Sequence, residues 1–313
     1  MVVVLIAVGA IIVLLQNSTP NPSAPTPATS YVIGSAQTCA GESDFVTAVG
    51  FSQRSALDTR AKFVKGAALR EIDQNGNITR SYEHPTWSMG GYLGAFQRDE
   101  FGNIYLVPTP FINVLDNPPE KANIIYRIDS ATGEMSPLVD LPPLAPVAPE
   151  NPFGLLDITY DCDTLSLYAS SVMGSTYDTV AGSIFQVDPQ TGEVRDRLDS
   201  VDAFGVGVFN SLQGKRLYFG LARTPEIYSV ALDDSGAFTD DIRLETALTD
   251  TAAFANERAS SITFHGPAQL VIKMERFDFN LVSPTEHVTT YLSYSYNANE
   301  DTWELLTSQD VSE

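Results

Sequence analysis

The chain has 313 residues, of which 43% are hydrophobic and 18% charged, as expected for a globular protein rather than a disordered one. Its 39 acidic and 18 basic residues give a formal net charge of −21. A chain this acidic repels phosphate backbones and carries no basic cluster, which argues against nucleic-acid binding. The acidity indicates either a solvated surface that keeps the protein soluble, or a site for a divalent cation or a basic partner.

The N-terminal segment is apolar. Residues 1–15 contain no polar side chain, and a stretch rich in Pro, Ser and Thr follows, Pro20–Ser30. Fifteen residues fall short of the ~20 that cross a bilayer, and no Lys or Arg precedes them. We predict a signal or anchor segment over 1–16 and a tether over 17–30. The rest of the protein is then extracytoplasmic, in a periplasm or at a cell surface, either membrane-anchored or secreted; whether the segment is cleaved stays open.

Two cysteines, Cys39 and Cys162, are far apart in the sequence and form no CxxC motif. In an exported protein two such residues can form one disulfide. Two separate buried thiols are an equal alternative, because a free cysteine behaves as a small apolar residue.

A repeated hairpin dominates the rest of the chain. Three copies are clear, at 69–78, 126–135 and 185–194, and looser copies lie at 228–238 and 292–303. In each clear copy an Asp opens the turn by accepting bonds from the backbone, and a Gly adopts the positive φ that closes it. A β-hairpin that recurs at intervals of about 45 to 65 residues is typical of the blades of a β-propeller.

The spacing predicts an all-β propeller over 31–308 with five four-stranded blades, while a sixth degenerate blade stays open. A β-sandwich would show turns every 8–12 residues without this recurrence. In the first blade, Tyr31–Ala36 and Phe45–Gly50 are the expected inner strands, and 309–313 is expected to be an acidic tail. The five predicted blades span 30–84, 88–141, 150–200, 202–247 and 256–308.

The repeat resembles the SMP-30/gluconolactonase and NHL-like propeller superfamily. The resemblance rests on the segment Asp-Glu-Phe-Gly-Asn-Ile-Tyr at 99–105 and on the Asp-x-x-Thr-Gly-Glu hairpins at 129–134 and 188–193. It covers 30–308 as a repeat pattern. Because these motifs describe turns, they indicate the fold more strongly than the activity.

In lactonase-type members of that superfamily, acidic and amide side chains ahead of the innermost strands converge on calcium or another divalent ion. Their oxygens are the ligands that a hard cation prefers. The resemblance implies the same role here for Glu150, Asn151, Asp202, Asn256 and Glu257. The sequence departs from the pattern in two blades: the second offers His84 and Trp87, and the first offers no acidic residue.

Three irregular loops are expected on one face of the propeller, and long loops on a rigid scaffold commonly bind ligands or partners. The alternative is that they only pack over neighbouring blades, and binding is slightly favoured. The loops are Pro108–Lys121, with Phe111, Asp116 and Asn117; Met173–Gly182, with Tyr177 and Asp178; and Arg276–His287, with Phe277 and Asp278.

Catalytic motifs are sparse. The sequence has no G-x-S-x-G, H-E-x-x-H or P-loop pattern. His84 is the best candidate acid or base, although a structural role is favoured because no partner can be named for it. Asp157, inside a predicted inner strand, is either a base or metal ligand in the channel, or a buried carboxylate bonded to a neighbouring blade.

Two functions follow. The first is a membrane-tethered recognition or scaffold module, such as an accessory subunit of a membrane or cell-surface assembly, with a protein or small-molecule partner on the loop face. The second is a metal-dependent hydrolase of the lactonase type. In it, the ion would polarise an ester and His84 or Asp157 would activate water. The missing catalytic motifs favour the first.

Overall fold

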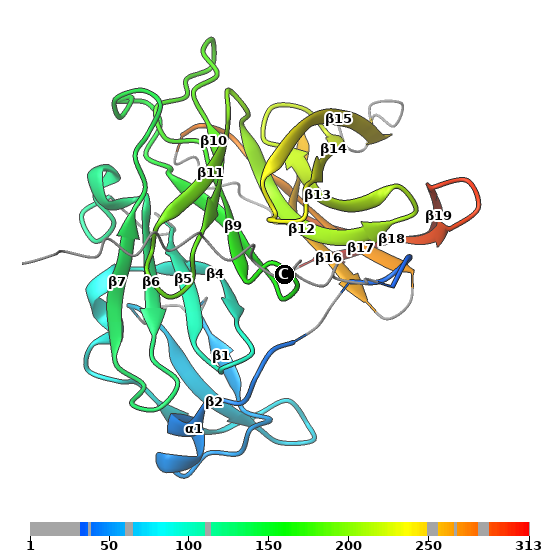
Figure 1. Ribbon diagram of the computed structural model, residues 1–313. Coiled ribbons are helices and arrows are strands. Elements are labelled where there is room, and N and C mark those ends of the chain that lie inside the picture. The colour runs from blue at the N-terminus through cyan, green and yellow to red at the C-terminus, as the bar shows by residue number, and fades with distance from the viewer. Residues whose placement is uncertain are drawn as a thin grey trace, which may run out of the picture.

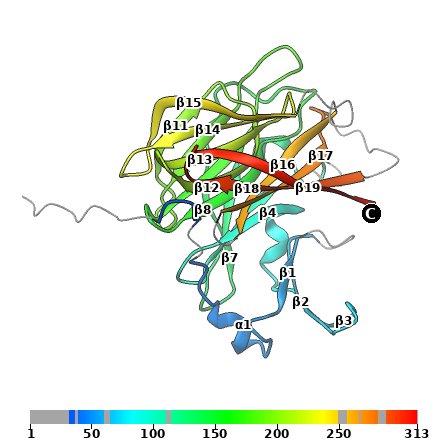
Figure 2. The same ribbon diagram turned by 90° about the vertical axis from the view of Figure 1, so that its right-hand side faces the viewer.

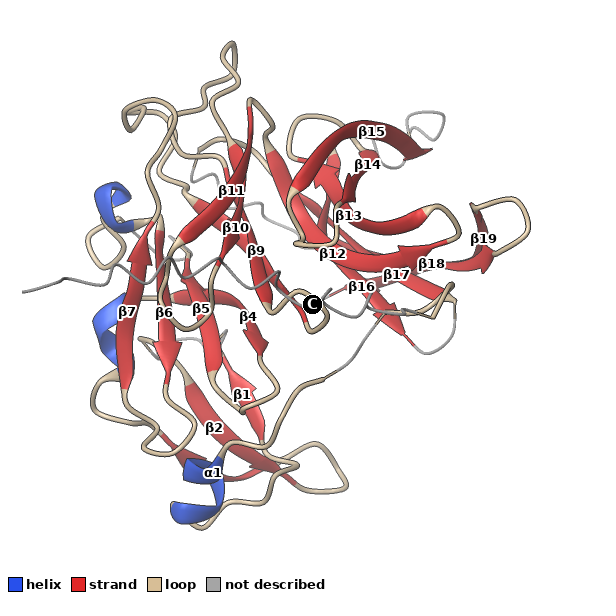
Figure 3. Ribbon diagram, in the orientation of Figure 1, coloured by secondary structure: helices blue, strands red, loops and turns tan. Residues whose placement is uncertain are grey.

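The computed structural model describes residues 32–36, 39–59, 65–109, 114–248, 256–265, 268–280 and 288–312. Five antiparallel sheets form a five-bladed β-propeller, as the repeat predicts (Figures 1 and 3). The helices among the described residues are short: α1 (Asp44–Ala48) and two 3₁₀ turns, η1 (Trp87–Gly90) and η2 (Pro119–Lys121). Within the described part of the chain, no helix is both long and apolar enough to cross a membrane. The predicted anchor at 1–16 and tether at 17–30 lie outside the described residues.

Blades 2 to 5 are four-stranded meanders in which each strand pairs with the next along the chain. The last strand reaches Ser312 and pairs with Val288, so the tail expected from residue 309 is mostly part of the sheet. The strands are β4 (Leu93–Arg98), β5 (Ile104–Pro108), β6 (Ile124–Ile128) and β7 (Met135–Asp140); β8 (Leu155–Asp161), β9 (Ser166–Ser171), β10 (Ser183–Val187) and β11 (Val194–Asp199); β12 (Ala203–Ser211), β13 (Gly214–Leu221), β14 (Glu226–Leu232) and β15 (Phe238–Ala247); β16 (Glu257–His265), β17 (Gln269–Arg276), β18 (Val288–Asn297) and β19 (Thr302–Ser312).

Blade 1 differs from the prediction. Its described sheet has three strands, β1 (Ala56–Asp58), β2 (Ala68–Ile72) and β3 (Ile78–Tyr82). The expected inner strand Phe45–Gly50 was wrong, because Asp44–Ala48 forms α1 and buries Phe45 and Val46. The other expected strand was also wrong, since Ser35 pairs with Asn210 of blade 4. Figures 1 and 2 show blade 1 and α1 together at one end of the molecule, below the other blades.

The hairpin turns form for the reason that the sequence indicates. Asp129 Oδ1 accepts bonds from the backbone N–H groups of Ala131 and Thr132, at 3.1 and 2.9 Å. Gly133 closes the turn at φ 74°, a left-handed conformation that costs glycine little. All such turns lie at one end of the blades, the turn end; the long loops lie at the opposite, loop end.

The core lies between blades. Apolar side chains from facing sheets form separate clusters between blades 1 and 2, 2 and 3, 3 and 4, and 4 and 5. Trp87 shows how blade 1 is held: it is fully buried beside Phe45, and its indole N–H bonds the Gly133 carbonyl of blade 2 at 2.8 Å. Each of these four clusters therefore joins one blade to the next, and a fifth, smaller cluster joins blades 3, 4 and 5 at the loop end.

An N-terminal strap, residues 32–36 and 39–43, crosses the turn end of the propeller (Figure 1). Gly34 N–H bonds the Asn210 carbonyl of blade 4 at 2.8 Å, and its own carbonyl accepts from Ala268 of blade 5 at 2.9 Å. Cys39 forms a disulfide with Cys162 of blade 3, with 6.1 Å between the Cα atoms. Gly41 N–H then bonds the Asp99 carbonyl of blade 2 at 2.8 Å. The strap thus ties four blades together, and of the two alternatives for the cysteines the disulfide is present.

Candidate binding face

At the loop end of blades 3 to 5, side chains from all three blades form a cluster of packed rings and hydrogen bonds. Its base is an aromatic cluster in which Phe277, from the loop after β17, contacts Phe153 and Phe204 with ring centroids 5.2 and 4.9 Å apart. Phe279 packs against Phe277 at 5.4 Å. Phe153 and Phe204 lie at the starts of the inner strands β8 and β12. Blade 5 therefore reaches across the entrances of the inner strands of blades 3 and 4.

Arg223 fastens the loop between β9 and β10 to blade 4. Its Nε donates to Asp202 Oδ2 at 2.5 Å, and its terminal nitrogens donate to the carbonyls of Thr176, Tyr177 and Thr179 at 2.6–2.8 Å. Its guanidinium also stacks over the Phe279 ring, 4.8 Å from the centroid. One arginine therefore connects three blades through charge-assisted bonds and a cation–π contact.

The carboxylate of Asp202 is enclosed. Its side chain is 1% exposed, and besides Arg223 it accepts bonds from the Ser175 hydroxyl and, at 2.9 Å, the Gly182 N–H. A Cβ on Gly182 would lie 2.5 Å from that carboxylate and 2.6 Å from the Val201 carbonyl. Only glycine therefore allows the loop to approach this closely.

Tyr177 stands on the loop that Arg223 holds, and 53% of it is exposed. Its hydroxyl donates to the Asp278 carboxylate of blade 5 and accepts from the Asn280 amide. The bond to Asp278 stabilises the neutral phenol and raises the pKa of Tyr177. Arg258, at the start of β16, lies half-buried nearby, with its Nε 3.2 Å from the Ala222 carbonyl, and desolvation lowers its pKa. The result is an exposed tyrosine beside acidic and amide groups on a firmly held loop.

The remaining loop-face candidates divide into two groups. Asp178 is exposed next to Tyr177, and Phe277 and Asp278 belong to the cluster just described. Asp116 and Asn117 lie elsewhere, over blade 2: Asp116 pairs with Lys65, and the Asn117 side chain bonds both backbone groups of Tyr92 at 2.8–2.9 Å. Phe111 lies outside the described residues. The structure therefore places four of the predicted residues together, and two apart from them.

The predicted metal ligands lie in different parts of the structure and differ in burial. Asn151 and Asp202 both bond Ser175, the first through the Ser175 carbonyl at 3.0 Å and the second through its hydroxyl. Glu257 Cα lies opposite Arg276 in blade 5, and burial raises its pKa. Glu150 and Asn256 are exposed loop residues. Among the described residues, no three His, Cys, Asp or Glu side chains are grouped so as to hold a metal. Asn151 Oδ1 accepts the Phe153 N–H, and the Asp202 carboxylate accepts three protein donors. The metal site stays a prediction.

The two catalytic candidates also lie apart. His84 follows β3, with its ring beside Tyr82 and Trp87 and its Nδ1 2.9 Å from Thr86 Oγ1. Asp157 lies in β8, is 7% exposed, and accepts the Val206 N–H of blade 4 at 3.0 Å. Val206 stands at an irregularity in the pairing of β12 with β13. Of the two expected settings for Asp157, the structure has the contact with a neighbouring blade.

The sequence reasoning missed Arg223, Phe279 and Asn280. Arg223 carries no motif, and its partners lie 21 to 47 residues away. One signal was available: Phe-Gly occurs at 153–154 and at 204–205, in equivalent positions of two blades. A repeated aromatic residue at the entrance to an inner strand predicts a shared cluster there.

No family model matches the sequence, and no curated protein matches it. The fold is similar to several solved structures at low identity. A Lactobacillus plantarum protein has a TM-score of 0.46 and 13% identity, over 81% of this chain and 80% of that one. The N-terminal domain of Nup159 has a TM-score of 0.43 and 12% identity, over 89% and 62%. The Bacteroides ovatus protein GH43B has a TM-score of 0.41 and 10% identity, over 68% of this chain and only 40% of that one.

These similarities concern the fold alone. The chain is a β-propeller, and its resemblance to the SMP-30/gluconolactonase and NHL-like propellers stays a prediction from its turns.

Proposed function

We propose that this protein is a recognition module that works outside the cytoplasm, tethered by its N-terminal segment, and that it binds a protein partner through the loop end of blades 3 to 5. The observation that carries the proposal is the exposed Tyr177, held by Arg223, Asp278 and Asn280 over an aromatic cluster. Tyrosine and arginine are enriched among the residues that dominate interface energies. Because the loop is already ordered, binding costs less conformational entropy.

Two further features support the proposed compartment and the proposed kind of partner. The Cys39–Cys162 disulfide is of the kind that persists in oxidising compartments, which supports an exported protein. The net charge of −21 and the exposed Asp178 beside Tyr177 favour a partner whose surface is basic.

The test compares Tyr177→Ala with Tyr291→Ala. Tyr291 lies on β18, is 36% exposed, and serves as a matched loss of an exposed tyrosine elsewhere. The purified full chain carrying each substitution is incubated with solubilised cell envelope, and a chemical cross-linker traps what is bound. We expect one specific cross-linked species with the original protein and with Tyr291→Ala, and its loss with Tyr177→Ala. A species of equal yield from all three proteins would contradict the proposal.

A further inference from the structure

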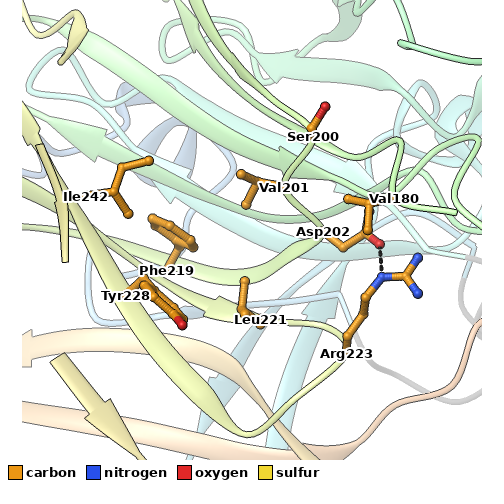
Figure 4. Close-up of a pocket in the computed structure, with 9 residues that line it drawn as sticks. All are labelled: Val180, Ser200, Val201, Asp202, Phe219, Leu221, Arg223, Tyr228 and Ile242. Carbon is orange, nitrogen blue, oxygen red and sulfur yellow. Dashed lines mark hydrogen bonds and ion pairs between the residues drawn. The ribbon is translucent and has the colours of Figure 1, made fainter. Parts of the chain in front are cut away.

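A cavity of about 250 Å³ opens between blades 3 and 4 (Figure 4). We call it the wedge pocket, and its position explains its origin. The two blades touch near the turn end, where Phe238 N–H of β15 bonds Asp196 Oδ2 of β11 at 2.7 Å. β11 ends at Asp199, whereas β15 is ten residues long and continues toward the loop end. The pocket lies where blade 4 extends beyond the cover that blade 3 provides.

The walls of the wedge pocket are mostly apolar. Val201 comes from the link between the blades, and Phe219, Tyr228 and Ile242 come from three adjacent strands of blade 4. Phe219 and Val230 lie in one buried cluster with Tyr168 and Ile184 of blade 3. Tyr228 is paired with Phe219 and Ile242 with Val230, so both share the face that meets blade 3. The charged groups Asp202 and Arg223 lie at one end and bond each other, as Figure 4 shows. The interior therefore offers an apolar environment.

Aliphatic side chains at the opening are exposed to water. Val180 is 41% exposed, Ile242 45% and Leu244 49%. Leu244 is paired with Tyr228, so it lies on the same face of β15 as Ile242 and extends the apolar surface outward. An exposed apolar patch joined to a cavity marks an interaction site.

The size and the charge of this region restrict what fits. Pockets for drug-sized ligands measure about 300–1,000 Å³, so about 250 Å³ suits a single large side chain. Exposed acidic residues lie within two positions of lining residues in the sequence, namely Asp178, Asp199 and Asp240. The lining arginine, Arg223, is paired with Asp202, and Arg197 is paired with Asp199. The rim therefore complements positive charge.

We propose that the wedge pocket is a docking site for a basic segment of a partner protein, which inserts one leucine-sized or aromatic side chain between blades 3 and 4. The site adjoins the Tyr177 face: Arg223 borders both, and Asp178 is close to both in the sequence. Tyr177 itself is not a lining residue of the pocket, so the proposal does not require the function proposed above.

The experiment uses three synthetic pentapeptides as probes: Lys-Lys-Leu-Lys-Lys, the same peptide with Ala in place of Leu, and Glu-Glu-Leu-Glu-Glu. Each is titrated into the full chain with methyl-labelled Val, Leu and Ile, and NMR shifts are recorded. We expect the lysine–leucine peptide to shift Val180, Val201, Leu221 and Ile242, with an affinity that falls as salt rises. Replacing Leu by Ala should weaken binding at least tenfold, because the alanine side chain leaves most of the apolar cavity unfilled.

A pair of variants locates the site. Ile242→Gln should weaken binding of the lysine–leucine peptide several-fold, whereas Ile78→Gln, which alters a 53% exposed residue on the outer strand of blade 1, should not. Tyr177→Ala should leave peptide binding unchanged, which separates this result from the proposed function. Shifts scattered over the acidic surface, equal binding of the alanine or glutamate peptide, or no effect of Ile242→Gln would overturn the proposal.

Discussion

A basic residue forms ion pairs at each end of the junction between blades 3 and 4, and the two residues differ in their partners and in their burial. At the turn end, Lys215 lies between Asp161 and Asp163, 2.6 Å from each, and all three side chains are at most 7% exposed. At the loop end, Arg223 pairs with the buried Asp202 but is itself 25% exposed. Lys215 lies at the start of β13, and Arg223 lies just after its end.

The difference lies in what each residue holds. Lys215 neutralises two buried carboxylates beside the Cys39–Cys162 disulfide, so it joins blade to blade. Arg223 donates three hydrogen bonds to backbone carbonyls of the loop between β9 and β10, so it holds this surface loop in one conformation. The turn end is accordingly where we expect stability to be concentrated, and the loop end where we expect recognition.

The strongest test of this comparison is Lys215→Ala. Removing the ammonium leaves two buried carboxylates without their counter-ion, and breaking a buried pair costs about 3–5 kcal/mol. Urea unfolding followed by tryptophan fluorescence should show a matching loss in the free energy of unfolding. Lys65→Ala, which breaks the exposed pair with Asp116, should leave the midpoint unchanged. Equal effects from both variants would show that the turn end is not specially dependent on Lys215.

Removing the disulfide tests the same end. The Cys39→Ser, Cys162→Ser double variant should lose about 2–4 kcal/mol, because the bond restricts the unfolded chain. Thermal unfolding with and without reductant measures the effect, and reductant should leave the double variant unchanged. If reductant also left the melting temperature of the original protein unchanged, the disulfide would not contribute to the stability of the fold.

At the loop end, Arg223→Lys should act locally. Lysine keeps a charge for Asp202 but cannot reach three carbonyls as the guanidinium does. We expect little change in global stability and about tenfold faster hydrogen exchange in residues 173–182, for a local loss of about 1.4 kcal/mol. Exchange is measured by mass spectrometry. A large drop in the free energy of unfolding, with unchanged exchange in residues 173–182, would show that Arg223 stabilises the whole fold and does not act on this loop alone.

The turn end should also weaken in acid. The Thr132 backbone N–H is the main cause that lowers the pKa of Asp129, and the Ser235 hydroxyl does the same for Asp233. A carboxyl whose folded pKa is depressed contributes stability above its ordinary value of 3.8, and this is lost as the pH falls through the lowered value. Melting temperatures between pH 5 and 2 should therefore fall less steeply for Asp129→Asn than for the original protein. Parallel curves would exclude this contribution.

The smallest effect is expected from a chelator. Asp202 and Asn151 already accept protein donors, so EDTA should leave the melting temperature unchanged. A clear decrease that Asp202→Asn abolishes would instead support the metal-dependent hydrolase hypothesis that the lactonase resemblance implies.

Local sequence patterns were sufficient for most of the fold. The Asp-to-Gly turns of blades 1 to 4 and the alternating strands are decided within about ten residues, so the outer hairpins could be predicted, although the turn of blade 5 contains no Gly. The inner part of blade 1 could not be predicted, because Phe45 and Val46 suit a strand as well as a short helix. Their burial against blade 2 decided for the helix.

The candidate site shows the same division. The loops that carry Tyr177 and Asp278 could be predicted from length and composition. Arg223 could not, because its role depends on carbonyls and a carboxylate that only the packing of three blades brings within reach. The pairing of Cys39 with Cys162 and the crossing of the strap were likewise decided by tertiary structure, since a turn is a local property, whereas a contact between blades depends on how whole sheets meet.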